Sequence, residues 1–542
     1  MRSTMMDHYP LTLVPILERA GKLFGKVEIV SNLPDKTLHR HTYADFYRRA
    51  RALAEALHRA GLKKGDRVAT LMWNHYAHLE AYFGIPVAGG VLHTLNLRLH
   101  PDDLTYIVTH ADDRFLIVDD VLLPLYEKFK DRVKIERVFV VPLTGKPIPE
   151  GYENYEDFLK TAMGDFQYPA LDEHDTLGMC YTSGTTGKPK GVAYSHRAVV
   201  LHSFAAGLAG AMGLTQHDVA LPVVPMFHAN AWGVPFVATM VGTKQVFPGP
   251  HLDPQSLLDL FEKEQVTFAA GVPTIWLGAQ QLLEKNPGRW KLAPGLRLTV
   301  GGAPTPEALI RSMDRHGIEI IHAWGMTETT PLGSVSRLKS YMLDWPEDKK
   351  YAYRAKQGLP SPFVEARIMT DSGEEGAWDG QTMGELQVRG PWVAASYYNN
   401  PDATDRWTED GWFKTGDVAC IDPEGYIEIR DRTKDLIKSG GEWISSVDLE
   451  NTLMAHPAVA EAAVVAIPHP KWQERPLAAV VLKEEYHGKV TPEELQEFLG
   501  RKFAKWWIPD AIVFVDEVPK TSVGKFQKTK LREQFKDWKW NE

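Results

Sequence analysis

The stretch that decides the fold runs from Tyr181 to Gly191 and reads Tyr-Thr-Ser-Gly-Thr-Thr-Gly-Lys-Pro-Lys-Gly. It combines three glycines, four serine or threonine hydroxyls and two lysines. Glycines let backbone N–H groups approach an anion closely, and hydroxyl and ammonium groups bind phosphate or a metal ion. This composition predicts a loop that binds a polyphosphate, with a mobile surface linker as the alternative reading of such a stretch taken alone.

The spacing of this loop differs from that of P-loop proteins. In the P-loop motif a serine or threonine follows the lysine and binds magnesium, whereas Pro189 follows Lys188 here. The stretch also lies between two apolar runs, the first from Leu177 to Tyr181, and functional loops of α/β proteins lie at such strand ends. We therefore expect a phosphate loop of another kind.

Five stretches resemble the signatures of the adenylate-forming enzymes, which include acyl-CoA synthetases, firefly-type luciferases and the adenylation domains of peptide synthetases. The first is the phosphate loop. The others are His322-Ala-Trp-Gly-Met-Thr-Glu328, Trp412-Phe-Lys-Thr-Gly-Asp417, Arg430-Asp-Arg-Thr-Lys-Asp-Leu-Ile-Lys-Ser-Gly-Gly441 and Pro519-Lys-Thr-Ser-Val-Gly-Lys525. They occur in the family's order and cover most of the chain, and within the superfamily the chain is most similar to medium- and long-chain fatty-acyl-CoA synthetases.

The resemblance implies an α/β protein of two domains. The large N-terminal domain, residues 1–430, would contain parallel α/β sheets and a β-rich subdomain. A hinge at residues 431–436 would join it to a small, mobile α+β lid, residues 437–542. A chain of 542 residues is long enough for this arrangement.

Hydrophobic periodicity agrees with this architecture. Thr42 to Gly61 is predicted to be an amphipathic helix with a capping box formed by Thr42 and Asp45. Gly384–Arg389 and Gly425–Arg430 alternate with period two, as in half-buried strands. The apolar runs that predict buried strands of a parallel sheet are Arg67–Trp73, Phe115–Val118, Val138–Val141, Val219–Val224, Val266–Ala270, Leu296–Val300 and Ile318–Ile321.

Composition excludes several classes of protein. The net charge of −9 and a pI near 6.1 argue against a nucleic-acid partner. The only two cysteines, Cys180 and Cys420, predict a reducing compartment without a disulfide framework, and no signal peptide is apparent. The run from Phe204 to Leu214 is too short to span a bilayer. We expect a cytoplasmic enzyme without an integral membrane segment, whose contact with membranes, if it takes substrate from them, is peripheral.

The resemblance implies a reaction in two steps. A fatty acid and ATP form an acyl-adenylate and pyrophosphate, and the thiol of coenzyme A then displaces AMP. Magnesium and cationic groups must stabilise the charge that passes to pyrophosphate. By resemblance, Thr182 and Glu328 are the protein ligands of Mg²⁺, and Thr327 contacts the α-phosphate.

The same resemblance assigns the nucleotide site. Asp417 would bind the two ribose hydroxyls, since a carboxylate accepts from both. Trp324 would stack on adenine, although most relatives have tyrosine at this position. The residues expected to bind ATP or coenzyme A are Thr182, Ser183, Gly184, Thr185, Thr186, Gly187, Lys190, Ala229, Gly302, His322, Ala323, Trp324, Thr327, Asp417, Arg432, Lys434, Lys438 and Trp443.

Lys525 resembles the family's mobile catalytic lysine, which bridges carboxylate and phosphate during adenylation. It lies far from the phosphate loop in the chain, so it reaches the site only if the small domain folds over the large one. A solvated lysine in a basic tail is the alternative.

The acyl site is the least defined part of this reading. His228 is either at the adenylation site or a hydrogen-bonded core residue. Trp232 either gates the acyl tunnel or is a core aromatic, and Gly271 would line the substrate site. No arginine or aspartate stands out as a ligand for a polar substrate, which favours an aliphatic chain.

Two other classes of function stay open at this point. One is an adenylating enzyme with another outcome, such as an aryl- or cinnamoyl-CoA ligase, an amino-acid adenylating enzyme or a luciferase. The other is a non-catalytic sensor of nucleotide or acyl ligand, which the presence of Thr182, Glu328, Asp417 and Lys525 disfavours. The partners expected are fatty acid, ATP and coenzyme A, and a homodimer is as compatible with the sequence as a monomer.

Overall fold

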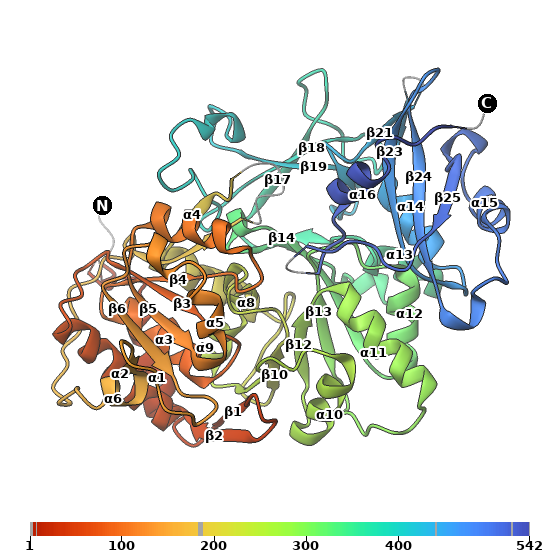
Figure 1. Ribbon diagram of the computed structural model, residues 1–542. Helices are drawn as coiled ribbons and strands as arrows, with labels where there is room; N and C mark the ends of the chain where they lie inside the picture. The colour runs from red at the N-terminus through yellow and green to blue at the C-terminus, as the bar shows by residue number, and fades with distance from the viewer. Residues whose placement is uncertain (1–3, 7, 183–187, 440–441, 522–523, 541–542) are drawn as a thin grey trace.

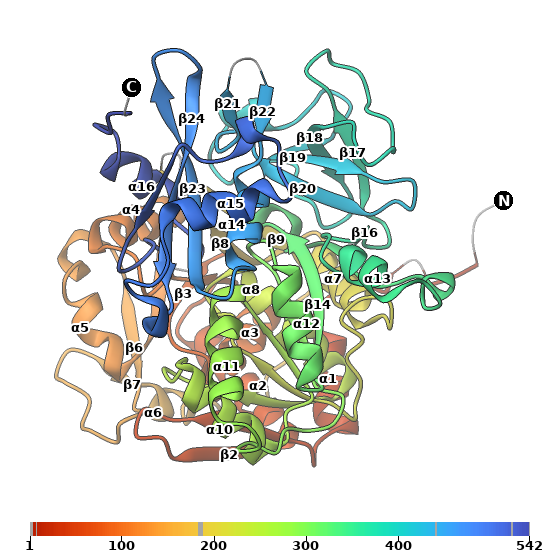
Figure 2. The same ribbon diagram turned by 90° about the vertical axis from the view of Figure 1, so that its right-hand side faces the viewer.

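The computed structural model of the protein describes residues 4–6, 8–182, 188–439, 442–521 and 524–540. A smaller C-terminal body, blue in Figure 1, lies across one side of a larger body formed by the preceding chain, and the turned view in Figure 2 agrees. The architecture is α/β, with a separate C-terminal domain, as the sequence predicts.

The largest sheet has nine strands among the described residues, and its central strands β11, β10, β12, β13 and β14 are parallel. Antiparallel strands complete both edges. In order across the sheet the strands are β16 (Leu359–Pro360), β15 (Leu332–Val335), β14 (Glu319–Gly325), β13 (Arg297–Val300), β12 (Phe268–Gly271), β10 (Val219–Pro222), β11 (Lys244–Phe247), β1 (Glu28–Asn32) and β2 (Leu38–Thr42).

A second sheet of seven described strands is parallel except at its last pair, β8 and β9, which flank the phosphate loop. These strands are short and mostly buried, as expected for a sheet covered on both faces. In order they are β7 (Glu153–Asn154), β6 (Arg137–Val141), β5 (Asp113–Asp119), β3 (Arg67–Leu71), β4 (Val91–Thr94), β8 (Thr176–Tyr181) and β9 (Gly191–Ser195).

An antiparallel sheet completes the large body, and another sheet forms the small one. The first contains β17 (Glu365–Met369), β18 (Gly384–Arg389), β19 (Phe413–Ile421) and β20 (Ile427–Arg432). The second contains β22 (Glu442–Ile444), β21 (Ile437–Ser439), β24 (Gln473–Leu482), β23 (Val459–His469) and β25 (Ala511–Phe514).

Helices cover these sheets. In the large body they are α1 (Val14–Leu23), α2 (Tyr43–Arg59), α3 (Tyr76–Val87), α4 (Pro101–Ala111), α5 (Leu123–Tyr126), α6 (Tyr155–Leu159), α7 (His196–Gly207), α8 (Ala229–Trp232), α9 (Val234–Val241), α10 (Pro254–Glu264), α11 (Pro273–Lys285), α12 (Glu307–Arg315) and α13 (Glu347–Arg354). In the small body they are α14 (Ser446–Met454), α15 (Pro492–Gly500) and α16 (Lys528–Gln534). None of the described helices is both long and apolar enough to cross a membrane.

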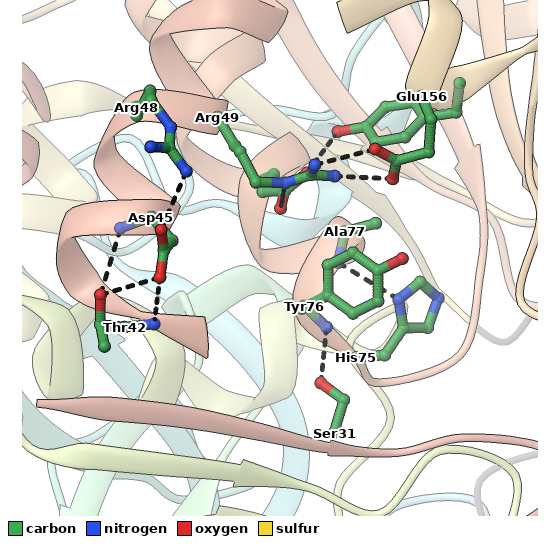
Figure 3. Close-up of polar contacts among 11 residues, drawn as sticks. Ser31, Thr42, Asp45, Arg48, Arg49, His75, Tyr76, Ala77 and Glu156 are labelled. Carbon is green, nitrogen blue, oxygen red and sulfur yellow. Dashed lines mark hydrogen bonds and ion pairs between the residues drawn. The ribbon is translucent and has the colours of Figure 1, made fainter. Parts of the chain in front are cut away.

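The capping box predicted for α2 is present. The N–H of Asp45 donates to Oγ1 of Thr42 over 3.3 Å, and the N–H of Thr42 donates to the Asp45 carboxylate over 3.0 Å (Figure 3). One turn further along α2, Arg49 binds the buried Glu80 of α3 and Glu156 of α6, at N–O distances of 2.6 and 2.7 Å. The N-terminus of α2 is therefore fixed by its own capping box, and its next turn is fixed by the ion pairs of Arg49 with α3 and α6.

The predicted strands are present with shifted ends. β14 continues four residues beyond the predicted end at Ile321, and β3 ends two residues before the predicted end at Trp73. The shift with most consequence is in β20, which continues to Arg432 because Asp431 and Arg432 still pair with β19. Two residues of the predicted hinge therefore belong to the sheet of the large body.

Candidate active site

The site lies at the carboxyl edge of the nine-stranded sheet, beneath the small domain (Figure 1). Because β10, β12, β13 and β14 are parallel, the loops after them emerge at the same edge. His228 lies in the loop after β10, Gly271 ends β12, Gly302 follows β13, and Trp324 is near the end of β14. Residues far apart in the sequence are thus gathered by the topology of the sheet.

Asp417 of β19 lies at the centre of a buried polar group. Its carboxylate accepts a hydrogen bond from the indole N–H of Trp324 over 2.9 Å. Its other oxygen is 2.6 Å from Nε of Arg432, which is its cross-strand partner in β20. The side chains assigned to ribose, adenine and the hinge signature therefore contact one another, although their separate roles in binding stay predictions.

Trp324 takes its position from a close approach to Gly333. A Cβ built on Gly333 would lie 2.3 Å from a carbon of the indole ring, so only glycine leaves room for Trp324 there. Asp417, on β19, is also held in place. Its N–H donates to the hydroxyl of Thr415, and the residue is only 2% exposed. Both partners of the Trp324–Asp417 hydrogen bond are thus held from outside the pair.

Glu328 lies in a 3-10 turn, Thr327–Thr329, just beyond β14. Oε1 of its carboxylate accepts a hydrogen bond from the hydroxyl of Tyr397 over 2.6 Å, and the Thr327 carbonyl accepts one from Tyr194 over 2.8 Å. Neither tyrosine stands out in the sequence, since Tyr194 and the Tyr397-Tyr398 pair all lie outside the signatures. They are the site residues that sequence reasoning missed.

Tyr397 also connects Glu328 with the phosphate loop. The ammonium of Lys190 lies 4.8 Å from the centre of the Tyr397 ring. The N–H of Lys190 donates to Oγ1 of Thr182 over 3.1 Å, and the N–H of Thr182 donates to the Lys190 carbonyl over 3.0 Å. These bonds join the two described ends of the loop beside Glu328, whereas Ser183, Gly184, Thr185, Thr186 and Gly187 lie outside the described residues.

The donors at this point suit a magnesium ion. Magnesium prefers oxygen ligands and is usually bound by one or two carboxylates together with substrate phosphates. Among the described residues no group of three His, Cys, Asp or Glu side chains could hold a metal ion. Glu328 and Thr182 supply one carboxylate and one hydroxyl, which fits an ion completed by substrate oxygens.

Lys525 enters the site from the small domain. A Cβ built on Gly302 would lie 3.2 Å from Cε of Lys525, so the lysine stem passes directly over this glycine, whose φ is +79°. The hydroxyl of Thr274, in α11, donates to the Gly524 carbonyl over 3.4 Å. The loop that carries Lys525 is therefore docked on the large domain in this structure.

The electrostatics of the site act on Lys525 and His228. Desolvation, followed by the charge of Arg432, lowers the pKa of Lys525 to about 8, and Asp417 and Glu328 oppose this shift. Desolvation, followed by the charge of Lys525, lowers the pKa of His228 to about 3. His228 is thus neutral at physiological pH, and Lys525 is near its point of ionisation in the protein without bound nucleotide.

The chain turns with left-handed backbone directly after His228. Ala229, Asn230, Ala231 and Trp232 have φ values of +42°, +52°, +50° and +56°. Such a conformation costs about 1–2 kcal/mol per non-glycine residue, and strain of this kind clusters at functional sites. The sequence gives no sign of it, because glycine appears only at position 233.

This turn places the indole of Trp232 against the glycines after β13. A ring carbon of Trp232 lies 3.5 Å from a Cβ built on Gly301 and another lies 3.7 Å from one built on Gly302. Gly271 is similarly close to Trp276, whose ring would be 2.7 Å from a Cβ at that position. Trp232 therefore borders the Gly302–Lys525 contact, and the assignment of Trp232 and Gly271 to the acyl site stays a prediction.

Some predicted residues make their hydrogen bonds or ring contacts with groups other than Asp417. The ring of His322 hydrogen-bonds with the Ala355 carbonyl over 2.9 Å, and Ala323 lies beside it in β14. Lys438 and Trp443 face each other across the β21–β22 pair, with the ammonium 4.3 Å from the ring centre. Both views place this hairpin at the outer end of the small domain, and the assignment of these two residues to the site stays a prediction (Figures 1 and 2).

Contacts on either side of Lys434 show where the two domains meet. The N–H of Thr433 donates to the Gly416 carbonyl of the large domain over 3.0 Å. Asp435 forms an ion pair with Arg532 of α16 over 2.7 Å. The N–H groups of Asp435 and Leu436 still donate to the Arg432 carbonyl of β20, over 2.8 and 3.0 Å, so contacts to the two domains overlap at Asp435.

Comparison with known proteins gives consistent matches over the whole chain. A family model described as AMP-binding enzyme matches residues 17–398, and one described as AMP-binding enzyme C-terminal domain matches residues 448–525. The chain is 53% identical to a long-chain-fatty-acid–CoA ligase of Thermus thermophilus, over 99% of this chain and 97% of the relative.

Other relatives differ in the acid that their names specify. A 3-methylmercaptopropionyl-CoA ligase of Ruegeria lacuscaerulensis is 44% identical, over 97% of this chain and 98% of the relative. A medium-chain-fatty-acid–CoA ligase of Ectopseudomonas oleovorans is 42% identical, over 97% and 96%. Among solved structures, the anthranilate CoA ligase AuaEII in complex with anthranoyl-AMP matches with a TM-score of 0.86 and 26% identity, over 97% of this chain and 98% of that one.

Proposed function

The chain belongs to the family of AMP-binding enzymes and is an AMP-forming acyl-CoA synthetase, and we propose that its acid substrate is a fatty acid of medium to long chain. The main structural support for the proposed catalytic mechanism is the position of Lys525. It lies over Gly302 and close enough to Asp417 and Glu328 for their charges to affect its pKa. This is the arrangement that the first of two half-reactions requires.

In that half-reaction a carboxylate oxygen of the fatty acid attacks the α-phosphorus of ATP. The bond from this phosphorus to the bridging oxygen breaks, and pyrophosphate leaves with the electron pair. The positive charge of Lys525 reduces the repulsion between the two anions that must approach each other. Glu328 and Thr182 would hold Mg²⁺, which neutralises charge on the phosphates when bound.

In the second half-reaction the sulfur of coenzyme A attacks the acyl carbon. The thiol proton passes to solvent, the bond from that carbon to the AMP oxygen breaks with its electron pair staying on that oxygen, and acyl-CoA and AMP leave. This step brings no carboxylate to a phosphate, so it does not need Lys525. We propose that the small domain turns about the hinge between the steps, that Lys434 is its pivot, and that Lys438 and Trp443 then face coenzyme A.

The proposal of an aliphatic acid rests on the apolar surroundings of Trp232. Val224, Val234, Phe268 and Val272 are buried in the same cluster as this tryptophan. The two fatty-acid ligases among the relatives support the same substrate class, whereas the methylmercaptopropionyl-CoA ligase favours a short acid as the second candidate.

The test is CoA-dependent AMP release, measured as kcat/KM for saturated acids of increasing length. We expect the maximum at a medium or long chain, with low values for 3-methylmercaptopropionate, benzoate and cinnamate. A maximum at one of those three acids would overturn the substrate assignment. AMP release that is independent of coenzyme A would overturn the reaction.

The cellular setting is proposed on separate grounds. The presence of only two cysteines, both buried and unpaired, fits a reducing compartment such as the cytoplasm. Sedimentation of the purified protein would distinguish a monomer from a homodimer.

Asp417→Ala is expected to raise the KM for ATP by about tenfold, because two hydrogen bonds from ribose hydroxyls to a charged acceptor are lost. The KM for fatty acid is the internal control and is expected to change little. Steady-state rates at varied ATP check this, and an unchanged KM for ATP would remove Asp417 from the nucleotide site.

A further inference from the structure

Asp431 is a residue of β20 whose side chain reaches the small domain, as does that of Arg430, which lies 3.5 Å from Asp448 of α14. The backbone of Asp431 pairs with Val418 of β19, so it is fixed in the four-stranded sheet. Its carboxylate instead contacts α14 of the small domain, where it accepts hydrogen bonds from the N–H of Ser446 over 2.8 Å and from the Ser446 hydroxyl. Asp431 and Ser446 are 1% and 0% exposed, so this contact excludes water.

The contact continues to the helix that follows Lys525. The ammonium of Lys528, in the first turn of α16, donates to Oγ of Ser446 over 2.6 Å and lies 2.7 Å from Oε1 of Glu450. Burial tends to lower the pKa of Lys528, but the carboxylates of Glu450 and Asp431 hold it above its usual value. A continuous chain of buried polar contacts thus leads from β20 to a position three residues from Lys525.

This chain of contacts cannot survive rotation of the small domain. Residues through Thr433 are bound to the large domain, whereas the side chain of Asp435 is paired with Arg532 of the small domain, to which α14 also belongs. A rotation about Lys434 moves Ser446 and Lys528 away from Asp431. Ser446 and Lys528 would keep their contacts within the small domain, and the carboxylate of Asp431 would be exposed to water, which lowers the cost of breaking the contact.

We propose that Asp431, acting through Ser446 and Lys528, is a positioning residue that holds the small domain in the arrangement with Lys525 in the active site. The proposal rests on the two-step reaction proposed above and adds a determinant of the balance between its steps. The contact exists in one arrangement only, so it stabilises that arrangement relative to the other.

The expected effect is on a ratio of rates. If the two arrangements exchange rapidly, each half-reaction proceeds in proportion to the population of its own arrangement. Weakening the contact lowers the ratio of those populations by the same factor whichever arrangement predominates. Loss of one buried hydrogen bond to a charged group corresponds to about tenfold.

The experiment measures the two half-reactions separately in Asp431→Ala and Ser446→Ala. Acyl-adenylate formation is followed from ATP and fatty acid, and thioester formation is followed from preformed acyl-adenylate and coenzyme A. The ratio of the first rate to the second is expected to fall by about tenfold or more in Asp431→Ala. It should fall by less in Ser446→Ala, because the N–H of residue 446 can still donate to Asp431. In the double variant the ratio is expected to fall no further than in Asp431→Ala, because Asp431 is the acceptor of both hydrogen bonds in the contact.

Thr491→Ala is the matched control. It removes the hydroxyl that caps α15 in the small domain, where it accepts from the N–H of Glu494 over 3.3 Å, and it does not touch β20. The cap contributes to stability in the same domain. A lowered melting temperature with an unchanged ratio is therefore expected.

The outcomes distinguish the proposals. A fall of both rates by the same factor in Asp431→Ala and Ser446→Ala, or the same ratio change in Thr491→Ala, would overturn the positioning role and leave the two-step reaction standing. Failure of the unmodified protein to form acyl-adenylate with any acid tested would instead overturn the proposed function.

Discussion

Lys525→Ala is expected to reduce acyl-adenylate formation from ATP and fatty acid by about 10²-fold or more, to the point of abolishing it in steady-state assays. The lysine supplies the positive charge at the place where carboxylate and α-phosphate, both anionic, must meet. Given preformed acyl-adenylate and coenzyme A, the same variant should form thioester at a substantial fraction of the normal rate, since thiol attack involves no such repulsion.

The pH dependence gives this prediction a second readout. Lys525 acts in its protonated form, and its pKa in the free protein is about 8. The value of kcat/KM for ATP should therefore decline as the pH rises through about 8, and this decline should disappear from the residual activity of Lys525→Ala. Comparable loss of both half-reactions would show that Lys525 supports the small domain as a whole.

Glu328→Ala is expected to cost about 10²-fold in acyl-adenylate formation, because a ligand of magnesium is lost beside a developing negative charge. The loss should be partly recovered at high magnesium. Tyr397→Phe is the graded comparison, since it removes only the hydrogen bond that orients the carboxylate, and we expect it to cost about fivefold to tenfold.

The fold of Glu328→Ala should be preserved, as judged by its circular dichroism spectrum. Near-normal rates of adenylate formation at ordinary magnesium would exclude Glu328 as a metal ligand. Equal rates for Glu328→Ala and Tyr397→Phe would mean that Glu328 acts through its hydrogen bond with Tyr397 and not as a ligand of magnesium.

The sequence predicts those parts of the site that depend on local chemistry. Asp417, Glu328 and Lys525 each lie in a short stretch that resembles a family signature, and this resemblance is what singles them out. The α/β class and the capping box of α2 are equally accessible, because periodicity and cap chemistry are local properties. The structure confirms both.

What the sequence leaves out is determined by contacts between distant segments. Tyr397 hydrogen-bonds to Glu328, which lies 69 positions earlier in the chain, and no sequence pattern around either residue predicts this contact. The left-handed turn after His228 is imposed on alanine, asparagine and tryptophan by the surrounding structure, against their intrinsic preference. The sequence predicts the end of β20 at Arg430, because charged residues resemble a linker, whereas the pairing of Asp431 and Arg432 with β19 keeps them in the sheet.

The claim at the centre of this account is that the arrangement seen here performs the first half-reaction and must be left for the second. A disulfide between the domains tests it directly. A Cβ built on Gly524 would lie 3.4 Å from Oγ1 of Thr274, which is close to the separation that a disulfide requires between Cβ of one cysteine and the sulfur of the other. The native cysteines, Cys180 and Cys420, are buried and will not compete.

The measurement is a single turnover of the Thr274→Cys, Gly524→Cys double variant, oxidised and then reduced. The reduced form is the baseline, because cysteine at position 524 must adopt a φ of +83°. We predict that the oxidised protein forms acyl-adenylate at the baseline rate and forms no acyl-CoA, and that reduction restores thioester formation. Acyl-CoA formed by the oxidised protein at the rate of the reduced one would contradict the account.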